Sequence, residues 1–309
     1  MARLPIVYHP DYMAPLRPGH RFPMSKYGYL RAALIARRLL PESGGGWIAP
    51  AEASVARAAA VHARDYVERV ATNRMHLEEV RRIGLPDTPA VARRAFLSAA
   101  GTLLAARLAL EHGLACNMAG GSHHAGPEGG AGFCVLNDVA VAAQALLDEG
   151  RVRRVLVVDC DVHQGDGTAR IFAGRSDVFT LSIHAEKNYP ARKAASHLDL
   201  PLPDGLEDAA YLEMLDHGLA RTQAFAPDIV FYNAGVDAHR EDRLGRLGLS
   251  DAGLRARDAR VIGWARTRGL PLAGVLGGGY DDDQERLAAK HAILFEEAAR
   301  ALDAPARAS

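Results

Sequence analysis

The sequence has little of what would place a protein in a secreted or membrane class. It contains three cysteines, Cys116, Cys134 and Cys160, and an odd, sparse set of this kind does not form a disulfide framework. The N-terminus has no signal sequence, and no apolar run approaches the ~18 residues of a membrane span. We therefore expect a soluble, cytoplasmic protein in a reducing compartment, with no membrane as a partner.

Neither sign of charge is in excess. The 309 residues carry 37 basic and 37 acidic side chains, so nothing predicts a partner among the nucleic acids. Only residues 1–50 are locally basic, with seven lysines and arginines against Asp11 and Glu42. A rim that attracts anionic partners is one interpretation of this imbalance, and a solvated surface is the simpler one.

No shift in composition marks a domain boundary, so we expect a single domain over 1–309 with a loose tail from about residue 303. Short apolar runs alternate with helical patterns, which predicts an α/β fold with a mostly parallel sheet covered on both faces. The expected strands span residues 4–8, 116–118, 153–158, 178–184, 228–232 and 271–276. The expected helices span 29–40, parts of 51–81, 90–112, 136–149, 208–225, 252–268 and 284–302, and residues 185–207 are expected to be irregular.

The most informative stretch is residues 159–167, which follows the apolar strand pattern of 153–158. Side chains alternate along a strand, so Asp159, Asp161 and His163 point to the same side if the extended backbone continues. Two carboxylates and an imidazole at a strand end can hold a divalent metal. Cys160 should face the other way and pack rather than bind metal. The alternative is an aspartate-rich loop with a chance histidine.

Other polar clusters also follow expected strands. His123 and His124 lie in a glycine-rich stretch after the strand at 116–118, and Asp237 follows the strand at 228–232. Tyr280 comes after a glycine triplet that ends the last strand. In a parallel sheet these clusters would meet at one edge, which is where sites in open α/β sheets lie.

Three nitrogen and oxygen ligands with an open position describe a catalytic zinc site, and Asp161, His163 and Asp237 supply such a set. A site of this kind lowers the pKa of bound water to about 7 and polarises a carbonyl. His123 or His124 would serve as general base and then general acid.

Two carboxylates, Asp159 and Asp166, are available to orient these histidines, and Tyr280 could donate its hydroxyl to a developing oxyanion. These parts suit metal-assisted hydrolysis of an amide. The chain lacks both a Ser-His-Asp nucleophile pattern and a nucleotide fingerprint.

Six segments carry a family resemblance, and they lie at residues 121–124, 132–138, 159–167, 233–237, 242–245 and 277–280. In this order they resemble the zinc-dependent histone deacetylases and their bacterial deacetylase-like relatives. His-Gln-Gly at 163–165, in place of the His-His-Gly usual in class I members, is similar to the class IV subgroup. Asn-Ala-Gly at 233–235 and Tyr-Pro at 189–190 point to the same subgroup.

The resemblance implies an arginase/deacetylase-type fold, a single domain of three layers with an eight-stranded, mostly parallel sheet between helices. It implies one catalytic Zn²⁺ on Asp161, His163 and Asp237. It also implies that His124, paired with Asp166, is the main general base and acid.

The remaining site residues are assigned by the same resemblance. His123, paired with Asp159, would act mainly through its charge, and Tyr280 would polarise the acyl carbonyl. The expected substrate-binding residues are Gly132, Phe133, Tyr189 and Gly278, with the two aromatic rings as tunnel walls. A structural K⁺ would be held by the Ser182 hydroxyl and by the backbone of Asp159, Asp161, His163 and Ile183.

The implied activity is removal of acetyl or longer acyl groups from acyl-lysine in proteins or peptides. A rim aspartate of class I members has no clear counterpart, since Asp87 is off register. Its uncertain place leaves tight recognition of a peptide backbone open. The class IV likeness makes a long-chain acyl preference a hypothesis.

Three alternatives stay open, together with the oligomeric state, for which a homo-oligomer is one option. An arginase-like ureohydrolase with two Mn²⁺ would want an aspartate where Gly165 stands. A deacetylase of small amines such as acetylpolyamines would want an acidic, occluded rim, which the basic N-terminal region does not favour. A binding module without catalysis would be expected to lack a ligand, the base or the tyrosine, and all are present.

Overall fold

The computed structural model describes residues 3–41 and 46–303, so the tail expected from about residue 303 lies almost wholly outside the described residues. One sheet of seven strands runs through it, in the order β1-β2-β7-β6-β3-β4-β5, and every neighbouring pair is parallel. The strands are β1 (Ile6–Val7), β2 (Leu114–Asn117), β3 (Val155–Asp159), β4 (Val178–Ala185), β5 (Leu198–Leu202), β6 (Ile229–Asn233) and β7 (Leu272–Val275). The predicted α/β fold is confirmed, with seven strands in place of the eight expected.

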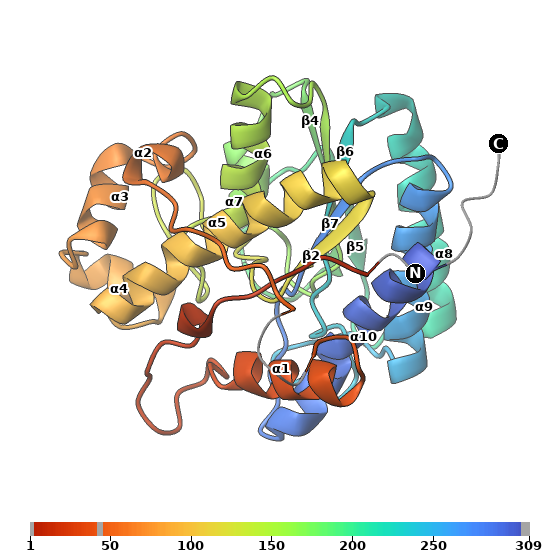
Figure 1. The fold of residues 1–309 in the computed structure, drawn as a ribbon, viewed down its shortest axis with the longest axis horizontal. Helices are drawn as coiled ribbons and strands as arrows, with labels where there is room; N and C mark the ends of the chain where they lie inside the picture. The colour runs from red at the N-terminus through yellow and green to blue at the C-terminus, as the bar shows by residue number, and fades with distance from the viewer. Residues whose placement is uncertain (1–2, 42–45, 304–309) are drawn as a thin grey trace.

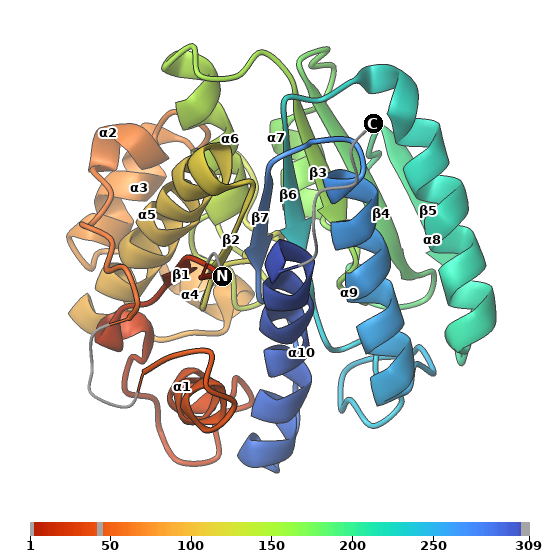
Figure 2. The same cartoon turned by 45° about the vertical axis from the view of Figure 1, so that its right-hand side comes forward.

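Helices cover both faces of the sheet (Figures 1 and 2). On one face lie α5 (Pro89–His112), α6 (Asp138–Asp148) and α7 (Asp166–Ile171), with α2 (Val55–Ala58), α3 (Arg64–Ala71) and α4 (Leu77–Ile83) beside them. On the other face lie α1 (Lys26–Ala36), α8 (Asp208–Thr222), α9 (Asp251–Arg266) and α10 (Gln284–Asp303). Short 3₁₀ turns span Pro10–Tyr12 and Gln223–Phe225.

Strand β3 shows how the sheet divides the core. Its side chains alternate, so Val155 and Val157 pack toward α5 and α6, whereas Leu156 and Val158 pack toward α8 and α9. All five residues of β3 are buried, as expected for a central strand of a parallel sheet. Because β3 pairs in parallel with β4 and β6, the loop after Asp159 emerges at the same edge of the sheet as the loops after those strands.

The longest helix, α5, begins and ends at residues suited to these positions. Thr88 caps its N-terminus by accepting a hydrogen bond from the Val91 backbone, and Pro89 occupies the first turn. Gly113 ends the helix with a φ of 83°, as the sequence predicts. The chain then enters β2 directly, which brings the histidine-bearing loop to the edge of the sheet.

The expectation that residues 185–207 are irregular is wrong, because β5 lies within them. Its side chains at Leu198, Leu200 and Leu202 are buried, and Asp199 and Pro201 between them break the apolar run that the prediction relied on. Proline is tolerated here because β5 is an edge strand. No helix in the described ranges has the length and apolar character needed to cross a bilayer.

Candidate active site

Three side chains from two neighbouring strands converge at the carboxyl edge of the sheet. Asp161 and His163 lie in the loop after β3, and Asp237 lies in the loop after β6. One ligand atom from each of the three lies within 4.8 Å of the others, and all three residues are buried. His163 Nδ1 is 3.0 Å from Asp161 Oδ1 and 3.2 Å from Asp237 Oδ2. The strand-end convergence predicted from the sequence is therefore present.

The chemistry of this group fits a divalent metal. Asp237 Oδ2 is buried and accepts no hydrogen bond, so its lone pairs are available to bind a cation. Burial lowers the pKa of His163, but the carboxylates of Asp161 and Asp237 outweigh it and raise the pKa to about 10. A protonated imidazole thus supplies the positive charge that the two carboxylates require, and a bound cation would replace that proton.

Gly278 allows the loop after β7 to close on this group. Its N–H donates to Asp161 Oδ2 at 2.6 Å. A Cβ atom at this position would lie 1.9 Å from Asp237 Oδ2, closer than any side chain can approach. Gly278, expected to bind substrate, lies against the two carboxylates and lines a small cavity together with Asp161 and His163.

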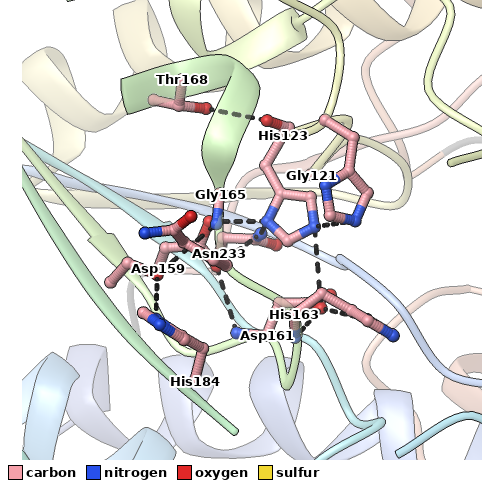
Figure 3. A network of polar contacts seen from close by, with 12 residues as sticks. Gly121, His123, Asp159, Asp161, His163, Gly165, Thr168, His184 and Asn233 are labelled. Carbon is pink, nitrogen blue, oxygen red and sulfur yellow. Dashed lines mark hydrogen bonds and ion pairs between the residues drawn. The ribbon is translucent and has the colours of Figure 1, made fainter. Parts of the chain in front are cut away.

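The two histidines each pair with the carboxylate that the family resemblance implies, and Figure 3 shows the pair of His123 and Asp159. His123 Nδ1 donates to Asp159 Oδ2 at 2.7 Å, and His124 Nδ1 donates to Asp166 Oδ1 at 2.7 Å. Arg170, one turn further along α7, forms an ion pair with the other oxygen of Asp166. Both imidazoles are 4% exposed, so these pairs fix their ring orientation out of reach of bulk water.

Only one proton lies between the two imidazoles. With both Nδ1 atoms donating to carboxylates, the Nε2 atoms face each other at 3.1 Å, and one of them must carry a hydrogen. Burial lowers the pKa of His123, but Asp159 and Asp161 outweigh it and raise the pKa to about 9. Burial and the neighbouring charge of His123 lower the pKa of His124 to about 3. The proton therefore sits on His123 and is donated to the Nε2 lone pair of a neutral His124.

Tyr280 reaches the same centre from the loop after β7. Its ring lies edge-on to His163, with the ring centroids 6.5 Å apart. Burial and the nearby carboxylates of Asp237 and Asp161 raise the pKa of its phenol well above 10, so the hydroxyl stays protonated. Among the described residues this hydroxyl makes no hydrogen bond, which leaves it free to donate to a ligand.

A pocket of about 260 Å³ opens above His124, His163 and Tyr280. Phe133 and Tyr189 form its walls, and the Tyr189 ring stands perpendicular to that of His124 at 4.7 Å between centroids. Gly132 lines the pocket between them, where a Cβ atom would lie 2.7 Å from the His124 ring. The predicted tunnel residues thus lie around one opening that ends at the histidines.

The five residues expected to hold K⁺ also lie together. Asp159 and Ser182 are directly paired across β3 and β4, and the Ala185 backbone donates to Val162 O at 2.9 Å, which folds the loop after β3 onto the end of β4. Ser182 Oγ lies 3.0 Å from His184 Nδ1.

The condition that the extended backbone continues to His163 is not met, because β3 ends at Asp159. The Asp161 backbone donates to Asp159 Oδ1 at 3.1 Å, and the His163 backbone donates to Asp161 Oδ1 at 3.0 Å. Each aspartate thus accepts a hydrogen bond from the backbone two residues later and forms a local turn. These turns, and not the alternation of an extended strand, orient the side chains of the site. Cys160 is fully buried in the apolar core, as predicted.

Asp87 does not reach the site. Its Oδ2 accepts a hydrogen bond from the Met75 backbone at 2.9 Å, and Asp87 is absent from the lining of the pocket. Gly165, where a second metal would need a carboxylate, also has no room for a side chain. A Cβ atom on Gly165 would lie 2.4 Å from Asp159 Oδ2, so an aspartate there does not fit and a two-manganese centre is disfavoured.

Sequence reasoning missed Arg257, which is fully buried on α9. Its guanidinium donates to the carbonyls of Gly235 at 2.5 Å, Ala234 at 3.3 Å and Cys160 at 3.3 Å. Its charge is balanced by Asp258 at 2.9 Å. Arg257 thus ties the loop carrying Asp161 to the loop carrying Asp237. Its place in the buried stripe with Leu254 and Val261 is the signal that could have found it.

Asp138 and Asp242 lie in the family motifs, and both form hydrogen bonds to the loops around the site. The sequence indicates no role for either residue. Asp138 accepts hydrogen bonds from the backbones of Gly121 and Ser122 at 3.1 and 2.7 Å, which fixes the histidine loop. Asp242 accepts one from the Tyr280 backbone at 2.6 Å. Burial and Asp237 raise the pKa of Asp242 to about 7.

Comparison with known proteins gives consistent results. Residues 20–295 match the family model for the histone deacetylase domain. An uncharacterised protein of Picosynechococcus is 45% identical over 296 residues, which cover 95% of this chain and 98% of that protein. Histone deacetylase 2 of Arabidopsis thaliana is 30% identical over 302 residues, which cover 94% and 78% respectively. The crystal structure of acetylpolyamine aminohydrolase from Burkholderia pseudomallei has a TM-score of 0.75 at 27% identity, covering 95% of this chain and 98% of that one.

Proposed function

The chain belongs to the histone deacetylase domain family, a family of amidohydrolases, and we propose that it removes acyl groups from acyl-lysine side chains in proteins or peptides. The observation that carries this proposal is the pocket in which a neutral imidazole, a group of side chains that could hold a metal and an unpaired phenol meet. Its aromatic walls suit the aliphatic stem of a lysine. We propose that the whole chain serves this site as one domain.

Asp161, His163 and Asp237 would hold one Zn²⁺, because two carboxylates and one imidazole with an open side match a catalytic zinc site. When bound, the ion supplies Lewis acidity to the acyl carbonyl and lowers the pKa of a water molecule. We also propose that Asp159, Asp161, His163, Ser182 and Ile183 hold a structural K⁺ through the atoms predicted from the resemblance.

The proton steps belong to His124. Its Nε2 accepts a proton from the attacking water and returns it to the leaving lysine amine, while Asp166 holds its Nδ1–H and so its orientation. His123, paired with Asp159, places positive charge beside the reacting centre. Positive charge of a bound metal nearby would lower the pKa of His123 from the value it has alone.

Tyr280 stabilises the oxyanion. Its protonated hydroxyl donates to the carbonyl oxygen as negative charge develops, an interaction of roughly 3 kcal/mol in comparable sites. Phe133 and Tyr189 exclude water along the stem of the substrate, and the Gly132 backbone lies where the amide enters.

The test is turnover of lysine peptides carrying acetyl, butyryl, octanoyl and myristoyl groups by zinc-loaded protein. We expect hydrolysis, and we expect His124→Ala to lower kcat/KM by about 10²–10⁴-fold. The chain-length profile also tests the long-chain hypothesis, which poor turnover of every long acyl group beside good turnover of acetyl would sink. No turnover of any peptide would contradict the proposal.

A second candidate is hydrolysis of small acylated amines. It is supported by the similarity to a solved acetylpolyamine aminohydrolase. Including acetylspermidine and acetylputrescine in the same assay separates the two candidates, since turnover of the polyamines alone would keep the residues' roles and change the substrate class.

A further inference from the structure

A second hollow, of about 310 Å³, lies beside the mouth of the tunnel. Its walls come from residues 17–21 and 81–84. The first segment precedes α1 and the second ends α4, and both elements are labelled in Figure 1. The charged lining of the hollow consists of Arg17, Arg21, Arg81 and Arg82, and no carboxylate lines it. We call this hollow the arginine groove.

The arginine groove is continuous with the active site. Phe133, a wall of the tunnel, also lines the groove, and Arg21 lines both hollows. The Gly132 and Phe133 backbones donate to the carbonyls of Arg82 and Ile83 at 3.1 and 2.7 Å. A chain leaving the tunnel past Phe133 therefore enters a surface of four guanidinium groups.

His20 holds the two walls of the groove together. Its Nδ1 accepts a hydrogen bond from the Phe22 backbone at 3.0 Å, which assigns the hydrogen to Nε2. Nε2 then donates to Gly84 O at 3.0 Å, across the groove. The His20 ring also packs edge-on against Phe133, with the centroids 6.1 Å apart. The guanidinium groups thus lie on walls that are fixed relative to the tunnel.

Within the described residues, none of the four groove arginines pairs with a carboxylate. Within residues 3–41 and 46–303, the side chains of Arg17, Arg21 and Arg81 form no ion pair or hydrogen bond, and Arg82 donates only to Gly130 O. Arginines elsewhere on the surface do find carboxylates, as Arg93 does with Asp11 and Glu52. Four like charges gathered without counter-ions form a local positive field.

We propose that the arginine groove binds acidic side chains that flank the acyl-lysine of a polypeptide substrate. This inference rests on the proposed function and names the substrate class of the same site. Guanidinium groups pair with carboxylates in a planar, two-bond geometry, so aspartate and glutamate are the residues that fit. The groove extends outside the tunnel, so its occupant is longer than one acylated amine. Polyamines carry positive charge, which the groove repels.

The experiment measures kcat/KM for three acetyl-lysine peptides whose flanking residues are acidic, neutral or basic on both sides. We expect the zinc-loaded protein to favour the acidic over the basic peptide by about 10-fold or more at low salt, and the ratio to shrink as salt screens the charges. Acetylspermidine should be turned over less efficiently than the acidic peptide.

The variant Arg17→Glu/Arg81→Glu should abolish or reverse the acidic-to-basic ratio. Its matched control is Arg151→Glu/Arg153→Glu, which adds the same charge change at two exposed arginines before β3, at the opposite end of the sheet. The control should keep the wild-type ratio. A wild-type ratio near one, a ratio unchanged in the groove variant, or acetylspermidine equal to the acidic peptide would overturn the inference.

Binding of the same labelled peptides, measured by fluorescence anisotropy, separates this inference from the proposed function. Tighter binding of the acidic peptide that is lost in the groove variant supports the groove even where no peptide is hydrolysed. Hydrolysis of all three peptides at equal rates with equal affinities would leave the proposed function in place and remove the inference.

Discussion

The floor of the active site and its mouth use charge in opposite ways. The catalytic floor, which consists of Asp161, Asp237, His123, His124 and His163, is at most 7% exposed, and each of its side chains makes a hydrogen bond. The arginine groove at the mouth is exposed and almost without partners. A buried charge needs a hydrogen-bond or ion-pair partner within the protein, whereas an exposed charge is hydrated and remains available to a ligand. In the proposed function the buried floor carries the reaction, and we propose that the exposed mouth selects the substrate.

The strongest way to break the floor is to remove one ligand charge without changing shape. Asp237→Asn should reduce bound zinc from about one ion per chain to almost none, and deacylation should fall to background, because a neutral amide is a poor zinc ligand. Metal analysis after dialysis and the acetyl-lysine assay measure both effects. Circular dichroism should show an intact fold. Full zinc content in the variant would contradict the ligand assignment.

Tyr280→Phe tests the floor without touching its metal. We expect kcat/KM to fall by about 10²–10³-fold, because the phenol's hydrogen bond to the oxyanion is lost, while zinc content stays at the wild-type level. Unchanged turnover would remove the proposed role of the hydroxyl and bring back a binding function for the pocket.

Arg257→Met tests whether the hydrogen bonds of the buried Arg257 side chain position the proposed metal ligands. The change leaves Asp258 buried without its partner, so we expect the free energy of unfolding to fall by about 3–5 kcal/mol. Because the carbonyls of Cys160, Ala234 and Gly235 lose their donor, zinc affinity should fall roughly 10-fold in chelator competition.

The double variant Arg257→Met/Asp258→Asn separates these two effects. It removes the unpaired charge and should recover part of the stability, but the carbonyls remain without a donor, so zinc affinity should stay low. Recovery of wild-type affinity in the double variant would show that Arg257 only balances Asp258 and does not position the ligand loops.

The smallest effect is expected at the boundary between floor and mouth. Asp281 follows Tyr280 and accepts two hydrogen bonds from Arg286, at 2.7 Å each, which lower its pKa to about 2. The folded pKa lies below the unfolded value of about 3.9, so the stabilisation is present above that value and is lost as the pH falls toward 2. Urea unfolding should therefore show a stability difference between wild type and Asp281→Asn that shrinks below about pH 4.

The matched control for this measurement is Asp282→Asn. Asp282 is 83% exposed by its side chain and pairs with the exposed Arg243. Solvent screening makes such a pair contribute little, so this variant should show no comparable dependence on pH. Equal behaviour of the two variants would remove the distinction between them.

The sequence predicts the floor well because strand ends in a parallel sheet meet at one edge. The apolar run before Asp159, the run before Asn233 and the run before Gly277 each indicate where a strand ends, so the residues after them could be grouped without knowing any contact. Strand β5 was missed because Asp199 and Pro201 interrupt its three buried leucines. A proline is tolerated at this place because β5 is an edge strand.

The mouth could not be assembled in the same way. The basic bias of residues 1–50 was visible, but Arg81 and Arg82 lie 60 residues beyond Arg21 and come from a different element. Their proximity depends on the His20 bond to Gly84 and on the path of the loop before α1, neither of which has a periodic signal. Arg257 was missed for the converse reason, since an arginine in a helix is normally solvated.

The position of β3 beside β6 also affects the order in which the metal centre is completed during synthesis. His163 is made 74 residues before Asp237, and both β4 and β5 are made in between. At roughly 5–20 residues per second, the nascent chain carries two of its three ligands for several seconds. Two ligands hold zinc weakly, so on the proposed ligand assignment stable binding of the ion follows the docking of β6 against β3. At that point β7 and α10 are still to be made or have only just left the ribosome.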